Sequence, residues 1–234
     1  MSRNKSLKKT DENQASQSNS LVEASYKMSV PAKRVMLLLL SKIHPAQQDV
    51  TTKITIQARD YSEKTGLSFA QSYRDIKNGC RELMKTIITV KDLKAKTTEE
   101  CVVVSWMKHH ENEGWLEATF SLWIMPHIHR MTRLGYTTIA VNEAIKFKSF
   151  NTIRLYEILM QWDSTGKRFI SIEDLRHAFQ IPPKSYAAFR DFRVKVIEPS
   201  VKEINEKTSW EITWEAIKTG KKITSVRFLF HKPN

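Results

Sequence analysis

The stretch ARDYSEKTGLSFAQSYRDIKNGCRELMKTI (residues 58–87) decides the fold, because it predicts a helix, a turn and a second helix. Gly66 stands where the first helix would end, since glycine readily adopts the left-handed conformation found there. Ser68, followed three residues later by Gln71, predicts a capping box that begins the second helix. Apolar side chains of this second helix recur at helical spacing, so we expect them to be buried: Phe69, Tyr73, Ile76, Cys80 and Leu83.

The opposite face of the second helix is basic and amide-rich. Arg74, Asn78, Arg81 and Lys85 recur on it at helical spacing. Guanidinium and amide groups bond the edges of guanine and adenine, or the phosphates beside them. A solvated basic face is the alternative interpretation of one such helix taken alone. The candidate DNA-binding residues here are Ser68, Gln71, Arg74, Lys77, Asn78 and Arg81.

The order of elements around this stretch occurs twice, roughly a hundred residues apart, without a repeat of the residues themselves. In the first copy a buried helix and a short strand precede the helix-turn-helix, and strands follow it at 87–90, 100–107 and 115–125. In the second copy an amphipathic helix (149–162) precedes a short strand (167–172), a short helix, a long helix (187–208) and two strands (210–217 and 223–230). Two tandem winged helix-turn-helix units, an α+β fold, account for both copies.

The long helix of the second copy repeats the combination of a buried stripe and basic edges. Phe189, Phe192 and Val196 predict the stripe, and Pro199 predicts a kink or break after the basic segment. We expect Lys184 and Ser185 to lie at the beginning of this helix, where phosphate is commonly bound. The turn KTGKK (218–222) would form the tip of a wing. The candidate DNA-binding residues of this copy are Lys184, Ser185, Arg190, Arg193, Lys195, Lys218, Lys221 and Lys222.

Composition supports a polyanionic partner. The 234 residues carry 38 Lys and Arg against 25 Asp and Glu, a net charge of +13. Two cysteines without a CxxC pair exclude a cysteine-based zinc module and a disulfide scaffold, and favour the reducing cytoplasm. The N-terminus has no apolar segment of a signal peptide, and the run VMLLLL (35–40) is too short to span a bilayer. Nucleic acid is therefore favoured over a membrane as the partner.

Three domains are predicted along the chain. Residues 1–20 are rich in Ser, Asn, Gln and Lys and predict a disordered N-terminal tail. Residues 21–144 predict an N-terminal winged-helix domain for dimerisation and DNA binding. Residues 145–234 predict a C-terminal winged-helix domain that does most of the DNA reading.

Several stretches resemble the Rep initiators of iteron-containing plasmids, a family that includes the F-plasmid initiator. The strongest are IRLYEILMQW (153–162), FRDFRVKVIEPSVKEIN (189–205) and AIKTGKKITSVRFLF (216–230). NSLVEASYKMS (19–29) is similar to the start of that family's N-terminal domain. The resemblance extends over about residues 19–230 and is strongest from residue 149 onward.

The resemblance implies a plasmid replication initiator that binds iteron repeats in an origin and helps to open it. It also implies that a homodimer, in equilibrium with the monomer, binds an operator inverted repeat and represses its own promoter, with chaperones, a host initiator and a helicase as partners. Arg193 and Lys195 fall where the F-type protein places arginines in the major groove. Two helices in successive major grooves would lie about one turn, ~34 Å, apart on roughly 20 base pairs.

A rolling-circle nicking endonuclease is the enzymatic alternative. HIH (127–129) matches the metal-binding signature of such enzymes, and Tyr73 with Lys77 loosely fits the nucleophile and its neighbour. Tyr73 is expected on a buried stripe, however, and three-residue motifs are common by chance. We therefore expect His127 and His129 to be linker or surface residues, and no enzyme, metal or cofactor.

A winged-helix transcriptional repressor without an initiation role is the second alternative. It would need the same DNA-reading parts, so spacing and composition do not separate it from an initiator.

Two smaller features have structural interpretations. His109 and His110 are expected in an exposed hairpin loop. Leu21, Met28 and Val35 are spaced as in a zipper, but Pro31 interrupts any continuous coil, so we expect them to pack into the first domain.

Overall fold

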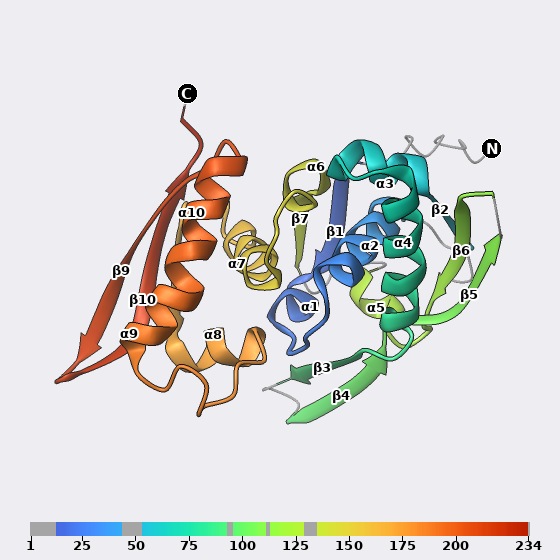
Figure 1. The fold of residues 1–234 in the computed structure, drawn as a ribbon. Helices are drawn as coiled ribbons and strands as arrows, with labels where there is room; N and C mark the ends of the chain where they lie inside the picture. Colours follow the sequence, from blue (N-terminus) through green and yellow to red (C-terminus); the bar gives the residue numbers. More distant parts are fainter. Residues whose placement is uncertain (1–12, 44–52, 93–95, 111–112, 129–134, 234) are drawn as a thin grey trace, which may run out of the picture.

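Helix α7 (Phe150–Met160) runs through the middle of the molecule, with one group of helices and strands on each side of it (Figure 1). The computed structural model describes residues 13–43, 53–92, 96–110, 113–128 and 135–233. Within these ranges no helix is long and apolar enough to cross a membrane.

The elements before α7 make up the first unit and its N-terminal additions. In chain order they are β1 (Gln14–Ser18), α1 (Asn19–Glu23), α2 (Val30–Ser41), β2 (Ile54–Gln57), α3 (Ala58–Thr65), α4 (Phe69–Leu83), β3 (Ile87–Asp92), β4 (Thr97–Val102), β5 (Val104–His110), β6 (Trp115–Phe120), α5 (Met125–Ile128), β7 (Tyr136–Ala140) and α6 (Val141–Ala144).

The elements after α7 make up the second unit. They are β8 (Lys167–Ser171), α8 (Ile172–Ala178), α9 (Phe189–Phe192), the π-helical turn η2 (Arg193–Ile197), α10 (Glu198–Lys207), β9 (Glu211–Thr219) and β10 (Lys222–His231). With α7 as the helix before β8, the chain contains the predicted order of helix, strand, helix-turn-helix and hairpin twice.

The two units share one sheet topology. The first sheet has the strand order β2-β6-β5 and the second the order β8-β10-β9, with all pairs antiparallel. In each sheet the strand before the helix-turn-helix pairs with the last strand of the hairpin. The prediction of two tandem winged helix-turn-helix units is thus confirmed at the level of strand pairing.

The helix-turn-helix of the first unit follows the local sequence closely. Helix α3 ends at Gly66, whose φ of +74° is left-handed. The Ser68 side chain accepts a hydrogen bond from the Gln71 backbone N–H, as half of the predicted capping box requires. Helix α4 packs closely on α2 at Gly79, where an added Cβ would lie 2.9 Å from Val35 Cγ2. Glycine is therefore required for this approach of the two helices.

The predicted disorder of residues 1–20 is wrong for the part that the structure describes. Residues 14–18 form β1, which pairs with β7, and the Ser18 side chain caps α1. Ala15 and Gln17 are buried although the segment is mostly polar. A strand can bury polar side chains when tertiary partners satisfy them, and composition does not reveal such partners.

The strands of the first unit are divided differently from the prediction. The expected strand 100–107 is two strands, β4 and β5, separated at Val103, because β4 pairs with β3 whereas β5 pairs with β6. The expected strand 115–125 ends at Phe120, and α5 begins at Met125. Continuous apolar runs do not show where a chain leaves one sheet for another.

Helix α7 is buried on all sides rather than amphipathic as predicted. Arg154 and Glu157 are fully buried in it and pair with each other at 2.6 Å. Lys33 of α2 contacts Glu157 Oε1 at 2.7 Å and donates a hydrogen bond to the Tyr26 hydroxyl at 2.7 Å. Gln17 of β1 also donates to Glu157. We call Gln17, Tyr26, Lys33, Arg154 and Glu157 the buried charge cluster.

The charged and hydroxyl groups of the buried charge cluster are hydrogen-bonded, whereas Gln17 Oε1 and Arg154 Nε have no partner among the described residues. Arg154 donates to the carbonyl oxygens of Val22 at 2.7 Å and Ala24 at 2.9 Å, and to the Tyr26 hydroxyl. Burial lowers the pKa of Lys33 to about 8, against the opposing attraction of Glu157. Burial alone would raise the pKa of the Glu157 carboxyl, but Lys33 and Arg154 outweigh it and hold that pKa below its ordinary value. The cluster thereby ties α7 to α2 and to the N-terminal segment.

Helix α7 also contacts the second unit through α10, so it packs against both units. The predicted division between residues 144 and 145 stays a prediction for this reason. Leu21, Met28 and Val35 are all buried in the core of the first unit, which confirms that they pack there.

Candidate nucleic-acid interface

The basic face of α4 is exposed as predicted. Arg74, Asn78 and Arg81 point to solvent on this helix, and Lys85 follows its C-terminal end. Lys77 is half-buried, and Ser68 is exposed at the N-cap. The Gln71 amide donates to Asp75 at 2.6 Å and accepts from Arg74 at 2.9 Å instead of returning to Ser68. Gln71 therefore orients Arg74 along the surface of the helix.

The buried face of α4 differs from the prediction at its first residue. Ile76, Cys80 and Leu83 are fully buried and Tyr73 is half-buried, but Phe69 is 55% exposed. Phe69 lies in the first turn, beyond the end of the core, where its ring contacts Gly114 of the β5–β6 turn. Periodicity gives the face of a helix and not how far the core extends along it.

The long helix of the second unit is composite. Phe192 and Val196 are buried and Phe189 is half-buried, which supports the predicted stripe. Of the predicted kink or break at Pro199, the break does not occur, because the helix continues from α9 into α10 through an irregular π-turn directly before this proline. A proline ring clashes with the carbonyl four residues earlier, and widening the turn accommodates it without ending the helix. The Glu198 N–H accordingly donates to the Arg193 carbonyl, five residues back.

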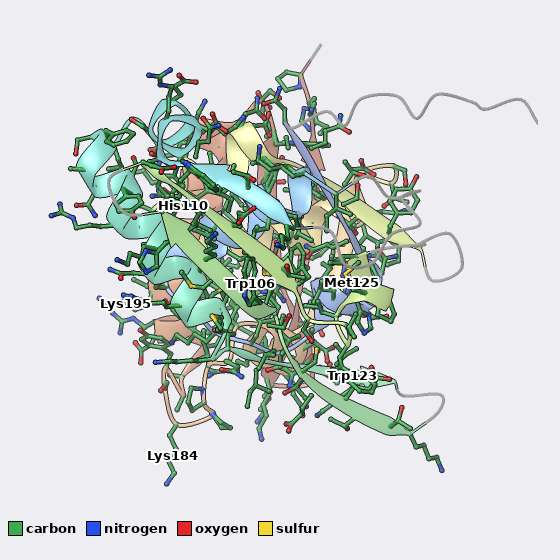
Figure 2. The ribbon with its side chains drawn as sticks, turned by 90° about the vertical axis from the view of Figure 1, so that its right-hand side faces the viewer. Trp106, His110, Trp123, Met125, Lys184 and Lys195 are labelled. Atoms are coloured by element: carbon green, nitrogen blue, oxygen red, sulfur yellow. The ribbon has the colours of Figure 1, made fainter. Side chains whose placement is uncertain are left out.

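The cationic residues of this helix lie on its exposed side. Arg190 and Lys195 are exposed, whereas Arg193 is partly covered. Arg193 Nε lies 3.3 Å from Glu198 Oε1, an ion pair between residues that the π-turn brings together. Lys195 lies at the left edge of the molecule in Figure 2.

Lys184 and Ser185 lie upstream of the helix as predicted, but not directly at its entry. They lie in an exposed turn, and the helix starts only at Phe189, after Ala188 as a cap without a capping side chain. The turn is closed by a hydrogen bond from the Ser185 N–H to the Pro182 carbonyl at 2.9 Å. Prolines at 182 and 183 disfavour helical backbone at Ile181 and Pro182, so the helix does not start there.

One cation beside this turn was missed by the sequence analysis. Arg176 of α8 donates hydrogen bonds to the carbonyl oxygens of Pro182, Ser185 and Tyr186. Its guanidinium also lies over the Phe192 ring, with 4.7 Å from Cζ to the ring centroid. Backbone carbonyls are common to all residues, so no sequence pattern indicates such contacts.

The wing of the second unit matches the prediction. Strands β9 and β10 are joined by Gly220 and Lys221, and Gly220 has a φ of +62°. Positive φ at the first residue of a two-residue hairpin turn favours glycine. Lys218, Lys221 and Lys222 are all exposed around this tip.

The basic helices of the two units lie on the same side of the molecule. Helix α4 and the α9–α10 helix both face the viewer in Figure 1. In Figure 2, turned by 90°, α4 and the labelled Lys195 both lie at the left. Candidate residues far apart in the sequence thus share one surface. The distance of one helical turn predicted between the two helices stays a prediction.

The histidines occupy other positions than expected. His127 is buried in α5, not on the surface or in a linker, and its Nδ1 lies 3.3 Å from Ser18 Oγ. His129 lies outside the described residues. His109 and His110 are half-buried at the end of β5, not in a loop, and His110 stacks on Trp115 with 3.6 Å between ring centroids. Among the described residues no three His, Cys, Asp or Glu side chains group as metal ligands.

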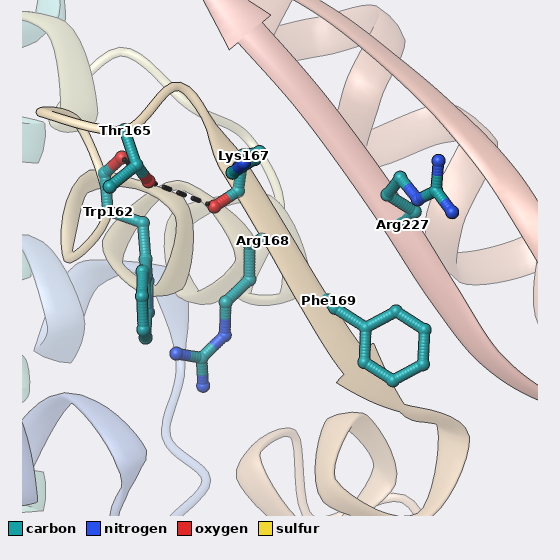
Figure 3. A pocket seen from close by; sticks show the side chains of 6 residues that line it. All are labelled: Trp162, Thr165, Lys167, Arg168, Phe169 and Arg227. Carbon is teal, nitrogen blue, oxygen red and sulfur yellow. Dashed lines mark hydrogen bonds between the residues drawn. The ribbon is translucent and has the colours of Figure 1, made fainter.

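A hollow of about 280 Å³ lies on the second unit away from these helices (Figure 3). Phe169 of β8 and Arg227 of β10 are opposite each other in register, and both are exposed. Their neighbours Ile170 and Val226 are buried in the core under the helices, so the hollow is on the other face of the sheet. We do not assign it to the interface. The residues that line it are Trp162, Thr165, Lys167, Arg168, Phe169 and Arg227.

These features define a protein with two winged-helix domains whose second helices are basic and lie on one surface. The sequence matches the family profile described as Initiator Replication protein, WH1, over residues 14–160. It matches the profile described as Initiator Rep protein, WH2, over residues 171–230. The chain belongs to this family of replication initiator proteins.

Individual relatives agree with the family assignment. An uncharacterized 27.6 kDa protein of Escherichia coli is 26% identical over 225 residues, covering 90% of this chain and 92% of that protein. The crystal structure of the Pi initiator protein in complex with iteron DNA superimposes with a TM-score of 0.81 at 20% identity, covering 97% of this chain and 99% of that one. Domains 2 and 3 of RctB give a TM-score of 0.51 at 10% identity, covering 92% and 85%. Both structures show the shared fold.

Proposed function

We propose that this protein is a plasmid replication initiator that acts in the cytoplasm by binding iteron repeats of double-stranded origin DNA. The observation that carries the proposal is the placement of α4 and the α9–α10 helix, both basic, on one side of one chain. Membership of the initiator family and the fold shared with a protein solved on iteron DNA support it.

The arrangement would suit binding to direct repeats. A monomer that presents two reading helices needs no two-fold symmetry in its site, unlike a dimer of single helix-turn-helix units. The exposed Arg74, Arg81, Arg190 and Lys195 would meet bases or phosphates, and the lysines of the wing tip would meet the backbone.

The first experiment is a footprint on origin DNA with separated monomer and dimer fractions. The monomer is expected to protect roughly 20 base pairs of each direct repeat. With about 6–10 phosphate contacts, affinity should fall by on the order of a thousandfold or more between 50 and 200 mM salt. A nearly flat salt response on repeat DNA would contradict the proposal.

Two variants test whether both helices read the DNA. Arg81→Ala in α4 and Lys195→Ala in the α9–α10 helix should each weaken binding and lower the salt slope by about one. Lys202→Ala is the matched control, because Lys202 is an exposed lysine of α10 that was not assigned to the interface. Equal effects of Lys202→Ala and Lys195→Ala would indicate general electrostatics instead of a defined surface.

The proposal includes autorepression by a dimer, which would be bound to an operator inverted repeat. Host initiator, helicase and chaperones would be the further partners. Maintenance of a plasmid that carries only the origin, with the protein supplied separately, distinguishes an initiator from a repressor without an initiation role. Repression of the promoter without plasmid maintenance would favour the repressor.

The proposal also holds that the protein acts by binding and not as an enzyme. Tyr73, the nucleophile of the nuclease alternative, is half-buried, and its hydroxyl donates to the His110 carbonyl at 3.1 Å. Supercoiled origin DNA incubated with Mg²⁺ or Mn²⁺ should stay uncut. Cleavage that is lost in Tyr73→Phe would overturn this part of the proposal.

A further inference from the structure

The turn before the α9–α10 helix is bound by the side chain of Arg176. Its guanidinium Nη1 lies 2.8 Å from the Ser185 carbonyl oxygen and 3.4 Å from that of Pro182. Nη2 donates to the Tyr186 carbonyl. Three carbonyls of one short turn thus converge on a single planar group, which has the donors to satisfy all of them at once.

The same guanidinium connects the turn to the helix. It lies over the ring of Phe192, which is fully buried and anchors α9 in the core. The position of the turn is therefore set relative to the helix that follows. Helix α9 has no capping side chain of its own, so no side-chain cap hydrogen bond fixes the turn to the start of the helix.

The turn adopts a backbone conformation that needs support. Tyr186 in the turn has a φ of +53°, in the left-handed region, and Gln180 before the turn has a φ of +48°. Residues other than glycine, asparagine and aspartate rarely adopt this region, and they remain there only when their surroundings impose it. The hydrogen bond from Arg176 to the Tyr186 carbonyl acts directly on this strained residue.

We propose that Arg176 is a positioning residue for DNA binding, which fixes the turn at residues 182–186 so that Lys184 and Ser185 meet DNA together with the α9–α10 helix. The inference rests on the proposed function and adds a residue to it. Arg176 acts through carbonyl oxygens of the turn, whereas the Lys184 and Ser185 side chains are exposed on it. A direct phosphate contact and a positioning role therefore predict different results.

The test uses Arg176→Lys and Lys184→Ala in the full chain, on a duplex of roughly 30 base pairs selected from random sequence by the wild type. Arg176→Lys keeps the charge but loses the planar fork, so affinity should fall about tenfold. The salt slope should fall by about one, because the misplaced Lys184 loses its phosphate contact. Lys184→Ala should lower the salt slope by a similar amount. In the double variant, the effect of Lys184→Ala should shrink, because Lys184 is already misplaced.

Wild-type affinity of Arg176→Lys, or fully additive effects in the double variant, would overturn the inference and leave the proposed function intact. A wild-type protein that selects no sequence would refute the proposed function itself.

A second pair of variants does not depend on the folding of Arg176 variants. Tyr186 is 42% exposed, and Tyr186→Asn and Tyr186→Val both remove its ring. Asparagine tolerates a positive φ and valine does not. Tyr186→Asn should bind several-fold more tightly than Tyr186→Val. Equal affinities would show that the conformation of the turn does not control binding.

Discussion

The two winged-helix units have the same strand order but secure their second helices in different ways. Helix α4 is an uninterrupted helix of 15 residues that begins at a capping serine and packs on α2. The second helix is assembled from α9, a π-turn and α10, and begins at Phe189 after Ala188, which has no capping side chain. The turn in front of it is bound by Arg176.

The two units therefore position their second helices by different means. Helix α4 is positioned by local sequence, through its cap and its apolar stripe. The α9–α10 helix is positioned by contacts that arise only in the folded domain. Both units meet at α7, whose buried charge cluster anchors the centre of the molecule. Variants can disturb the shared centre or either helix separately.

Removing the shared support should have the largest effect. Glu157→Gln leaves Lys33 and Arg154 buried without a counter-charge, and the loss of one partner of a buried ion pair costs about 3–5 kcal/mol of stability. The free energy of unfolding from denaturant titration measures it. Glu206→Gln, in an exposed pair with Lys202, is the control and should change stability by less than about 0.5 kcal/mol. Similar losses in both variants would show that the cluster is not a support.

Straightening the second helix should affect DNA binding more than stability. Pro199→Ala removes the ring that disfavours the regular α-helix, so we expect the π-turn to relax and Arg190 and Arg193 to change direction. Affinity for repeat DNA should fall by about tenfold, comparable to the loss of one base contact. The unfolding midpoint should stay the same or rise. Unchanged affinity would show that the π-turn does not aim these residues.

Removing the cap of α4 should lower the stability of the chain, and adding a cap to the α9–α10 helix should raise it. Ser68→Ala removes the side chain that caps α4 and should cost about 1 kcal/mol. Ala188 has φ −75° and ψ 137°, close to the backbone of Ser68 at −62° and 156°. Ala188→Ser should therefore stabilise the chain by up to a similar amount. Thermal unfolding measures both, and destabilisation by Ala188→Ser would contradict a shared capping geometry.

Alkaline pH tests the buried cation of the shared centre. Lys33 ordinarily titrates near 10.5 but does so at about 8 in the folded chain, so between these values the unfolded chain binds one more proton. Its contribution to stability therefore rises with pH across this window. Burial raises the pKa of Cys80 and Tyr61 to about 12, which acts in the opposite direction.

The difference in unfolding free energy between wild type and Lys33→Met isolates the lysine from these other groups. It should shift in favour of the wild type as pH increases from 8 to 10.5. A difference that stays constant with pH would show that Lys33 titrates normally.

The sequence by itself determined the features that depend on neighbouring residues. The Gly66 stop, the Ser68 cap, the exposed cations of α4 and the glycine turn of the wing were all predicted, because each depends on spacings of one to four residues. The repeated order of elements followed from the same local patterns. The exposed candidates Arg190 and Lys195 followed from helical periodicity.

Only the tertiary structure decided what distant residues do to one another. Strand β1 forms in a polar segment because β7 lies beside it, and Arg154 and Glu157 are buried because Lys33 and Tyr26 meet them from elsewhere in the chain. The turn at Lys184 and Ser185 depends on backbone carbonyls, which every residue shares. Local patterns fix a helix and its faces, whereas pairing across the chain depends on packing that a single sequence does not display.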